Sequence, residues 1–129
     1  MDLLSGLPNT YQNRFPRPPS VNTCFATDFR TRRRFATKAY QDWKLESLHL
    51  GMAGKKTIKG LVKVTFRFGR EKDKRRRDVN NYEKPLNDML VELGILEDDC
   101  MIQDQRNLWT SSVPAGMVDV IVEEWKGED

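Results

Sequence analysis

Residues 57–68 constrain the fold more than any other segment, because apolar and polar side chains alternate along them. The apolar members of this alternation are Val62, Val64, Phe66 and Phe68, and the polar members are Lys63, Thr65 and Arg67. A period of two places successive side chains on opposite faces of a β-strand. We therefore expect a half-buried strand with one apolar face and one wet face.

Two other segments have the apolar period of amphipathic helices. In residues 36–50 the recurring apolar side chains are Ala36, Ala39, Tyr40, Trp43 and Leu48, and Gly51 and Gly54 follow as stop signals. In residues 81–93 the apolar stripe consists of Tyr82, Leu86, Met89, Leu90 and Leu93, preceded by Val79. Gly94 is the expected stop of the second helix, and Pro85 is expected to distort its first turn.

The remaining segments predict extended chain. Prolines at 16, 18 and 19 exclude a helix there, and strands are predicted at residues 100–102, 108–112 and 117–125. The order of helix, strand, helix and several strands predicts an α/β (mixed α+β) domain with a mixed sheet packed against helices. We assign residues 1–14 to a flexible leader and residues 15–129 to this one domain, which is long enough for a single core.

The charged residues are clustered rather than spread along the chain. The 129 residues include 22 Lys and Arg against 19 Asp and Glu, a net charge of +3. The two basic runs are Arg30, Arg32, Arg33 and Arg34, and Lys72, Lys74, Arg75, Arg76 and Arg77. Charge runs are often only solvated surface, but two arginine-rich runs in one small domain favour a phosphate-bearing partner.

Several other chemistries are disfavoured by the sequence. Cys24 and Cys100 form no CxxC pair, which argues against a zinc site or a disulfide and fits a reduced, cytoplasmic protein. His49 is the one histidine, so nucleases with a histidine general base are disfavoured. No apolar run reaches membrane-spanning length. Glu124 and Lys126 form an E-x-K pattern like that of the PD-(D/E)xK nucleases, but this short match lies in a tail that we expect to fray.

Asp78 and Asn80 stand beside the second basic run, at the predicted start of the second helix. One interpretation is capping, because Asp and Asn are favoured N-caps and Asn80 with Glu83 resembles a capping box. Capping does not explain the neighbouring arginines, since the positive end of the helix dipole repels cations. A Mg²⁺ ion would reconcile carboxylates with a polyanion, because it binds carboxylate and phosphate oxygens together.

Asp98 and Asp99 follow the second helix, and Lys84 lies six residues after Asp78. A polar turn explains the acidic pair taken alone, and a solvent-facing side chain explains the lysine. A lysine beside a metal-bound phosphate would instead stabilise charge in the transition state. Asp99 lies 21 positions after Asp78, so the helix separates them unless neighbouring strands or a dimer bring the two together.

These residues resemble the RusA family of Holliday junction resolvases of bacteria and their phages. The family pattern is approximately D-x-D-N-x-x-K, then D-x-L, then G-hydrophobic-x-x-D-D. Here it reads DVNNYEK at residues 78–84, DML at residues 88–90 and GILEDD at residues 94–99. An upstream P-P-S-x-N is similar to PPSVN at residues 18–22, and the resemblance extends from about Pro16 to Trp125.

The resemblance implies a compact mixed α/β homodimer that binds four-way DNA junctions and makes paired symmetric nicks with Mg²⁺, or with Mn²⁺ in its place. It implies a metal site at Asp78, Asn80 and Asp99, with Lys84 as a fourth catalytic residue. The expected DNA-binding residues are Lys74, Arg75, Arg76, Arg77, Arg32, Arg33 and Arg34. A two-fold dimer also suits a two-fold junction.

This chain departs from the family pattern at Asn80, where the second aspartate of D-x-D is expected. The amide keeps an oxygen that can bind Mg²⁺ but lacks the negative charge. The chain could be an inactive engineered form, or a naturally weakened or junction-binding homologue. Alternatively, Asp98 or Asp73 could substitute for the missing carboxylate. A third hypothesis is an RNA-binding or interaction protein in which the acidic residues only cap helices and turns.

Overall fold

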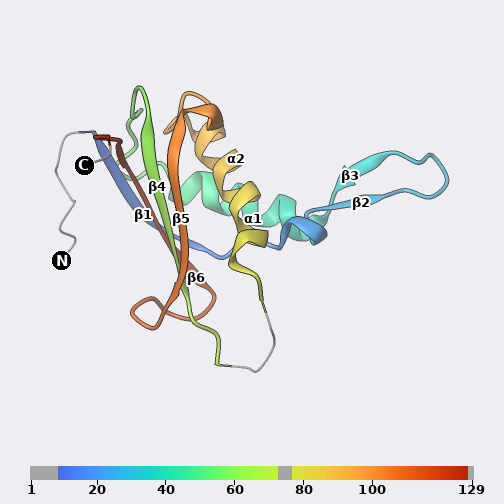
Figure 1. The fold of residues 1–129 in the computed structure, drawn as a ribbon. Coiled ribbons are helices and arrows are strands. Elements are labelled where there is room, and N and C mark those ends of the chain that lie inside the picture. The colour runs from blue at the N-terminus through green and yellow to red at the C-terminus, as the bar shows by residue number, and fades with distance from the viewer. Residues whose placement is uncertain (1–8, 73–76, 128–129) are drawn as a thin grey trace.

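The computed structural model describes residues 9–72 and 77–127. A four-stranded sheet with the order β1-β6-β4-β5 forms the body. Its strands are β1 (Thr10–Pro16), β4 (Val62–Gly69), β5 (Ile102–Thr110) and β6 (Met117–Glu124). The helices α1 (Lys38–Leu50) and α2 (Glu83–Leu93) pack together beside this sheet (Figure 1). The 3₁₀ turns are η1 (Val21–Thr23), η2 (Val79–Tyr82) and η3 (Asp99–Met101).

The sheet is mixed, as the sequence predicted. Strands β4 and β5 are parallel and are joined through α2, whereas β6 lies between β4 and β1 and is antiparallel to both. A parallel pair needs a crossover connection, and α2 supplies it. The mixed α+β class is therefore confirmed.

The alternating strand lies at the centre of the core. Val62, Val64, Phe66 and Phe68 are all fully buried. Three of them lie opposite valines of β6, with Val64 opposite Val122, Phe66 opposite Val120 and Phe68 opposite Val118. From the helices, Trp43 and Leu86 complete the same cluster. The predicted burial of one strand face is confirmed.

Both helices end where their glycines predicted. The side chain of Thr37 caps α1 by accepting a hydrogen bond from the Tyr40 amide, and Gly51 follows the last helical residue. Gly94 ends α2 in the left-handed conformation, with φ of 82°. Pro85 is the third residue of α2, and the chain before it winds as η2, so the predicted distortion near the proline is present.

Two strand predictions were wrong. Residues 99–101 form η3, and residues 102–110 form one continuous strand instead of two short ones. The sequence of β5 (IQDQRNLWT) has no clean apolar alternation, because this edge strand carries polar side chains on both faces. Periodicity alone therefore could not find it.

The leader prediction was wrong for residues 10–14, which form most of β1 and pair with β6. Tyr11 and Phe15 are buried there, opposite Val122 and Val118. This pairing joins segments more than a hundred residues apart, so no local sequence pattern predicts it. Residues 1–8 lie outside the described part of the chain.

A second sheet projects from the body. It is a two-stranded hairpin of β2 (Phe25–Thr27) and β3 (Arg34–Ala36), which extends well beyond α1 and α2 (Figure 1). Throughout residues 9–72 and 77–127, no helix has the length and apolar character that crossing a membrane requires.

Candidate active site and nucleic-acid interface

Asp78 lies at the start of η2, just before α2. Its carboxylate oxygen Oδ1 accepts a hydrogen bond of 2.9 Å from the backbone amide of Asn80. The capping interpretation is therefore confirmed for Asp78, which caps η2. It was wrong for Asn80 with Glu83, because Tyr82 is the N-cap of α2 and the Asn80 oxygen accepts from Asn107 instead of a helix amide. A carboxylate has about four lone-pair positions, so a cap can also bind a cation. Asp78 is exposed and accessible to a ligand from solvent.

A hydrogen-bonded network of amide side chains holds Asn80. The Nδ2 atom of Asn107 on β5 donates to Oδ1 of Asn80 at 3.1 Å and to Oε1 of Glu83 at 2.7 Å. Gln105 donates to Oδ1 of Asn107 at 2.9 Å, and Asn87 of α2 donates to Gln105 at 3.1 Å. The network ties η2, α2 and β5 together and fixes the direction of the Asn80 amide oxygen.

Asn107, Gln105 and Asn87 were missed by sequence reasoning. They belong to no motif with fixed spacing, and their strand was not recognised as continuous. One signal was present: amide residues recur at alternate positions 103, 105 and 107 of β5. Polar side chains that face a helix from an edge strand need partners, and here those partners are the motif residues.

Lys84 stands on the second position of α2 and forms an ion pair with Asp88 one turn later. Its Nζ atom lies 3.0 Å from Oδ1 of Asp88, and its side chain is 65% exposed. The hydrogen bond to Asp88 raises the pKa of Lys84, and Asp99 adds a smaller effect in the same direction. Lys84 therefore faces solvent, which was the first of the two interpretations of this lysine. It also lies close to Asp88 and Asp99.

The acidic pair after α2 folds back against the helix. Asp98 caps η3 by accepting a hydrogen bond of 2.9 Å from the Cys100 amide, and this contact lowers the pKa of Asp98. The adjacent Asp98 carboxylate raises the pKa of Asp99. A shallow surface pocket of about 330 Å³ is lined by Asp88, Val91, Glu92, Asp98 and Asp99.

The candidate ligands are chemically suited to Mg²⁺ but do not form a closed cage. Among the described residues, no group of three or more His, Cys, Asp or Glu side chains is placed to hold one ion. Mg²⁺ commonly uses one or two carboxylates, several waters and the phosphates of the substrate. Asp78, Asn80 and Asp99 offer oxygens of this kind at the surface, Asp78 and Asn80 before α2 and Asp99 after it.

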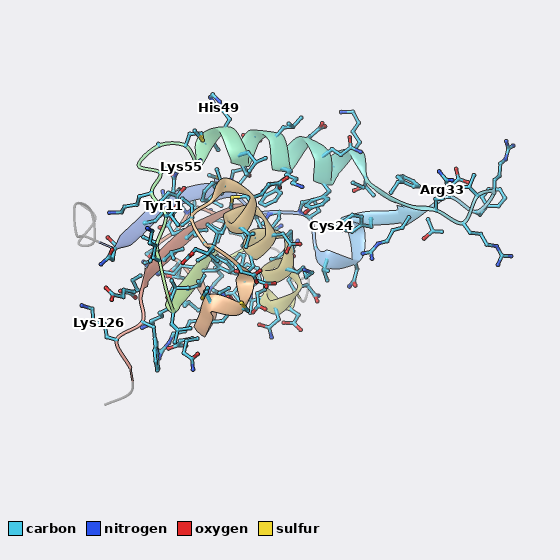
Figure 2. The ribbon with its side chains drawn as sticks, turned by 90° about the horizontal axis from the view of Figure 1, so that it is seen from above. Tyr11, Cys24, Arg33, His49, Lys55 and Lys126 are labelled. Carbon is cyan, nitrogen blue, oxygen red and sulfur yellow. The ribbon has the colours of Figure 1, made fainter. Side chains whose placement is uncertain are left out.

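The basic residues fall into two places. Arg32, Arg33 and Arg34 belong to the projecting hairpin and are exposed, with Arg33 near its far end (Figure 2). Arg77 is half-buried just before η2. The other expected DNA-binding residues (Lys74, Arg75 and Arg76) and the possible substitute ligand Asp73 lie outside the described residues.

The rival E-x-K pattern lies at the end of β6. Glu124 is the last residue of that strand, and its Oε2 atom accepts a hydrogen bond of 3.0 Å from Asn9. The Trp125 amide donates to Leu61 at 3.0 Å, so residues 124–125 are paired and the expected fraying there was wrong. The hydrogen bond to Asn9 gives Glu124 a structural role.

Comparison with known proteins agrees with the resemblance found in the sequence. A family model described as endodeoxyribonuclease RusA matches residues 16–120. The match begins at the last residue of β1 and includes both helices and all the motif residues. A search among curated proteins gave no match. The family match spans more than half of the chain, so this protein belongs to the RusA family of Holliday junction resolving endodeoxyribonucleases.

Proposed function

We propose that this protein is a Mg²⁺-dependent endonuclease that resolves four-way DNA junctions by paired symmetric nicks during recombination and repair. The observation that carries the proposal is the family match across residues 16–120, which contain the motif at residues 78–99. Lys84 adds support, because Asp99 contributes to the raised pKa of this lysine and therefore lies near it. Asp78 and Asn80 precede α2, and Asp99 follows it.

Asp78, Asn80 and Asp99 are the proposed metal ligands. A divalent ion bound there, Mg²⁺ or Mn²⁺, would supply an activated water and neutralise charge on the phosphate. Asn107 donates a hydrogen bond to the Asn80 amide oxygen. This uncharged ligand is therefore held in a fixed orientation. In the acidic pair, Asp98 accepts a hydrogen bond from the Cys100 amide, and Asp99 is the proposed ligand because it occupies the last aspartate position of the family motif.

Lys84 is proposed to stabilise the phosphate during hydrolysis. Because Asp88 raises its pKa, Lys84 keeps its positive charge through the neutral range. Its exposed ammonium group can exchange Asp88 for a phosphate oxygen, or contact both, as the pentavalent charge develops. Asp88 thus acts as a positioning residue that holds the ammonium group near Asp99.

The proposed assembly is a homodimer. A junction presents two equivalent strands to cut, and a two-fold protein presents two equivalent sites. A partner subunit could also supply acidic side chains to the open metal site, which holds fewer than three carboxylates within the described part of one chain. Cleavage by two subunits in one complex would give the paired nicks.

A second candidate function is junction binding without cleavage. It is favoured by Asn80, which removes one negative charge from the motif. Binding would then depend on the arginines of the hairpin and of the run before Asp78. Because phosphate contacts dominate such binding, affinity is expected to fall steeply with salt and to depend little on sequence. The location expected for either activity is the cytoplasm of a bacterial or phage-infected cell.

The test is cleavage of a labelled four-way junction with Mg²⁺, with Mn²⁺ and with chelator, using the chain and its Asp99→Asn and Asp78→Asn variants. We expect the metal to be required and each variant to lose roughly a hundredfold in rate, with binding retained. Asp42→Asn is the matched control, because Asp42 pairs only with surface Lys38 one turn away on α1. Equal rates in all four proteins would reject the proposed site.

A further inference from the structure

The β2–β3 hairpin carries an exposed phenylalanine, Phe29, in the turn at its end. Strand β2 pairs with β3 from Phe25 opposite Ala36 to Thr27 opposite Arg34, and residues 28–33 form the reversal. Figures 1 and 2 show this reversal standing away from the sheet and from both helices, and Figure 2 labels Arg33 on the outer part of the hairpin. The tip therefore reaches molecules that the body does not contact.

The tip has a defined shape, set by Asp28. Its Oδ1 atom accepts hydrogen bonds from the backbone amides of Arg30 at 2.8 Å and Thr31 at 3.2 Å. The Asp28 amide donates to the carbonyl of Arg33 at 2.9 Å, which closes the turn. Phe29 is one of the residues of this closed turn, so hydrogen bonds on both sides hold its backbone.

Phe29 is 88% exposed, the highest value among the large hydrophobic residues that the structure leaves in solvent. Phe25, at the base of the hairpin, has a different environment. Phe25 is 39% exposed, packs edge-on against Tyr40 at 5.3 Å and is covered by the Arg34 guanidinium at 4.2 Å. An aromatic ring held in water on a projecting, ordered turn indicates a surface used for contact.

The neighbours of Phe29 indicate what it contacts. Arg30, Arg32 and Arg33 surround it in the turn, and all three are exposed. Two copies of such a tip would repel each other, and an apolar protein pocket would have to desolvate three guanidinium groups. A nucleic acid offers both complements at once, because its phosphates bind arginine and its bases stack on aromatic rings.

We propose that Phe29 is a wedge that stacks on bases exposed at the centre of branched DNA, while Arg30, Arg32 and Arg33 bind the surrounding phosphates. The proposal rests on the function proposed above and adds the element that distinguishes a junction from linear duplex. In a linear duplex every base pair is covered by its neighbours, whereas the branch point interrupts that stacking. Inserted apolar side chains are a general means of holding DNA in an opened form.

The test compares binding of a four-way junction and of a linear duplex by the full chain and its Phe29→Ala and Phe29→Trp variants. A fluorescent base analogue at the branch point reports unstacking. We expect Phe29→Ala to weaken junction binding about tenfold, to leave duplex binding unchanged and to remove most of the fluorescence change. Phe29→Trp should retain both, because it retains a stacking ring.

Two controls separate the wedge from other roles. Leu45→Ala removes another exposed apolar residue, 70% exposed on α1, and should change nothing. Arg33→Ala should weaken junction and duplex binding alike. An unchanged junction preference in Phe29→Ala would overturn the wedge, and so would a loss of dimer in that variant, which would make the tip a contact between copies.

Failure of the wedge and failure of the proposed function give different results. If the unmodified chain binds junctions no better than duplex and cuts neither, the function itself is rejected, and the wedge with it. If the unmodified chain prefers and cuts junctions while Phe29→Ala behaves identically, only the wedge is rejected.

Discussion

The α2–β5 region and the β2–β3 hairpin hold their functional side chains by opposite means. In the first, Asn80, Asn87 and Asn107 are tied to each other across three elements, and α2 buries Leu86 and Met89 in the core. In the second, the tip is shaped within its own turn by Asp28, whose carboxylate accepts from the Arg30 amide and whose amide donates to the Arg33 carbonyl. The site is thus coupled to the stability of the fold, and the hairpin is largely independent of it.

This difference suits the two regions to two different tasks, hydrolysis and DNA recognition. Hydrolysis requires ligands held within a fraction of an ångström, which a packed helix and strand supply. Under our proposal, recognition of branched DNA needs reach and adjustment, which the projecting hairpin would supply. Substitutions should therefore divide cleanly between those that affect folding or cleavage and those that affect binding alone.

The largest expected effect tests the coupling to stability. Phe66→Ala should lower the free energy of unfolding by about 3–5 kcal/mol, because it leaves a cavity beneath α2 in the sheet core. Phe29→Ala should change it by no more than about 0.5 kcal/mol, since that ring is 88% exposed. Urea unfolding measures both, and similar losses would contradict the independence of the hairpin.

The next effect concerns the charge of the hairpin. Replacing Arg30, Arg32 and Arg33 together by alanine should reduce the slope of log affinity against log salt by up to about 3, because each lost phosphate contact changes it by about 0.9. Binding titrations from low to moderate salt measure this slope. The unfolding free energy should stay the same, and an unchanged salt slope would show that the hairpin does not contact phosphates.

A smaller effect is expected at the network that holds Asn80. Asn107→Ala should slow junction cleavage about tenfold and lower stability by about 1–3 kcal/mol, because two side-chain acceptors lose their shared donor. Junction affinity should be unchanged. Gln103→Ala, an exposed change on the same strand, is the control. A loss of affinity without a loss of rate would place Asn107 in binding instead of positioning.

The smallest expected effect is the slow alkylation of a cysteine at the base of the hairpin. Cys24 is buried there, and burial raises the pKa of its thiol to about 11. Cys100 is exposed on η3, where the hydrogen bond with the carboxylate of Asp98 also raises its pKa. Since the thiolate is the reactive form, alkylation near pH 8 should modify Cys100 first and Cys24 only after unfolding. Mass spectrometry distinguishes the two, and early labelling of Cys24 would mean that the hairpin base opens in the native state.

The parts of the fold that were predicted from the sequence have local patterns. The period of β4, the apolar stripe of α2 and the glycines that end both helices are each set by residues close together in the chain. Strands β1 and β5 lie at the two edges of the sheet, where their polar residues need not alternate, and their pairing partners are distant in sequence. The hairpin has no alternating apolar face at all, so its strands could not be seen.

The candidate site divides in the same way. The motif residues Asp78, Asn80, Lys84 and Asp99 could be found because their spacing along the chain is fixed. Their partners Asp88 and Asn107 acquire a role only through contacts made by folding, as an ion pair and a bridging amide. Whether Asp78 and Asp99 share one metal ion was open from their spacing and remains the content of the proposal.

The most direct test of the central claim is cleavage of a labelled four-way junction in Mg²⁺ by this chain and by its Asn80→Asp variant. The variant restores the charge of the family motif, and Asn107 can donate to a carboxylate as it donates to the amide. We predict paired nicks from both proteins, faster in the variant. Cleavage by the variant alone would keep the site and identify Asn80 as the disabling residue, whereas intact junction binding with no cleavage by either would contradict the claim.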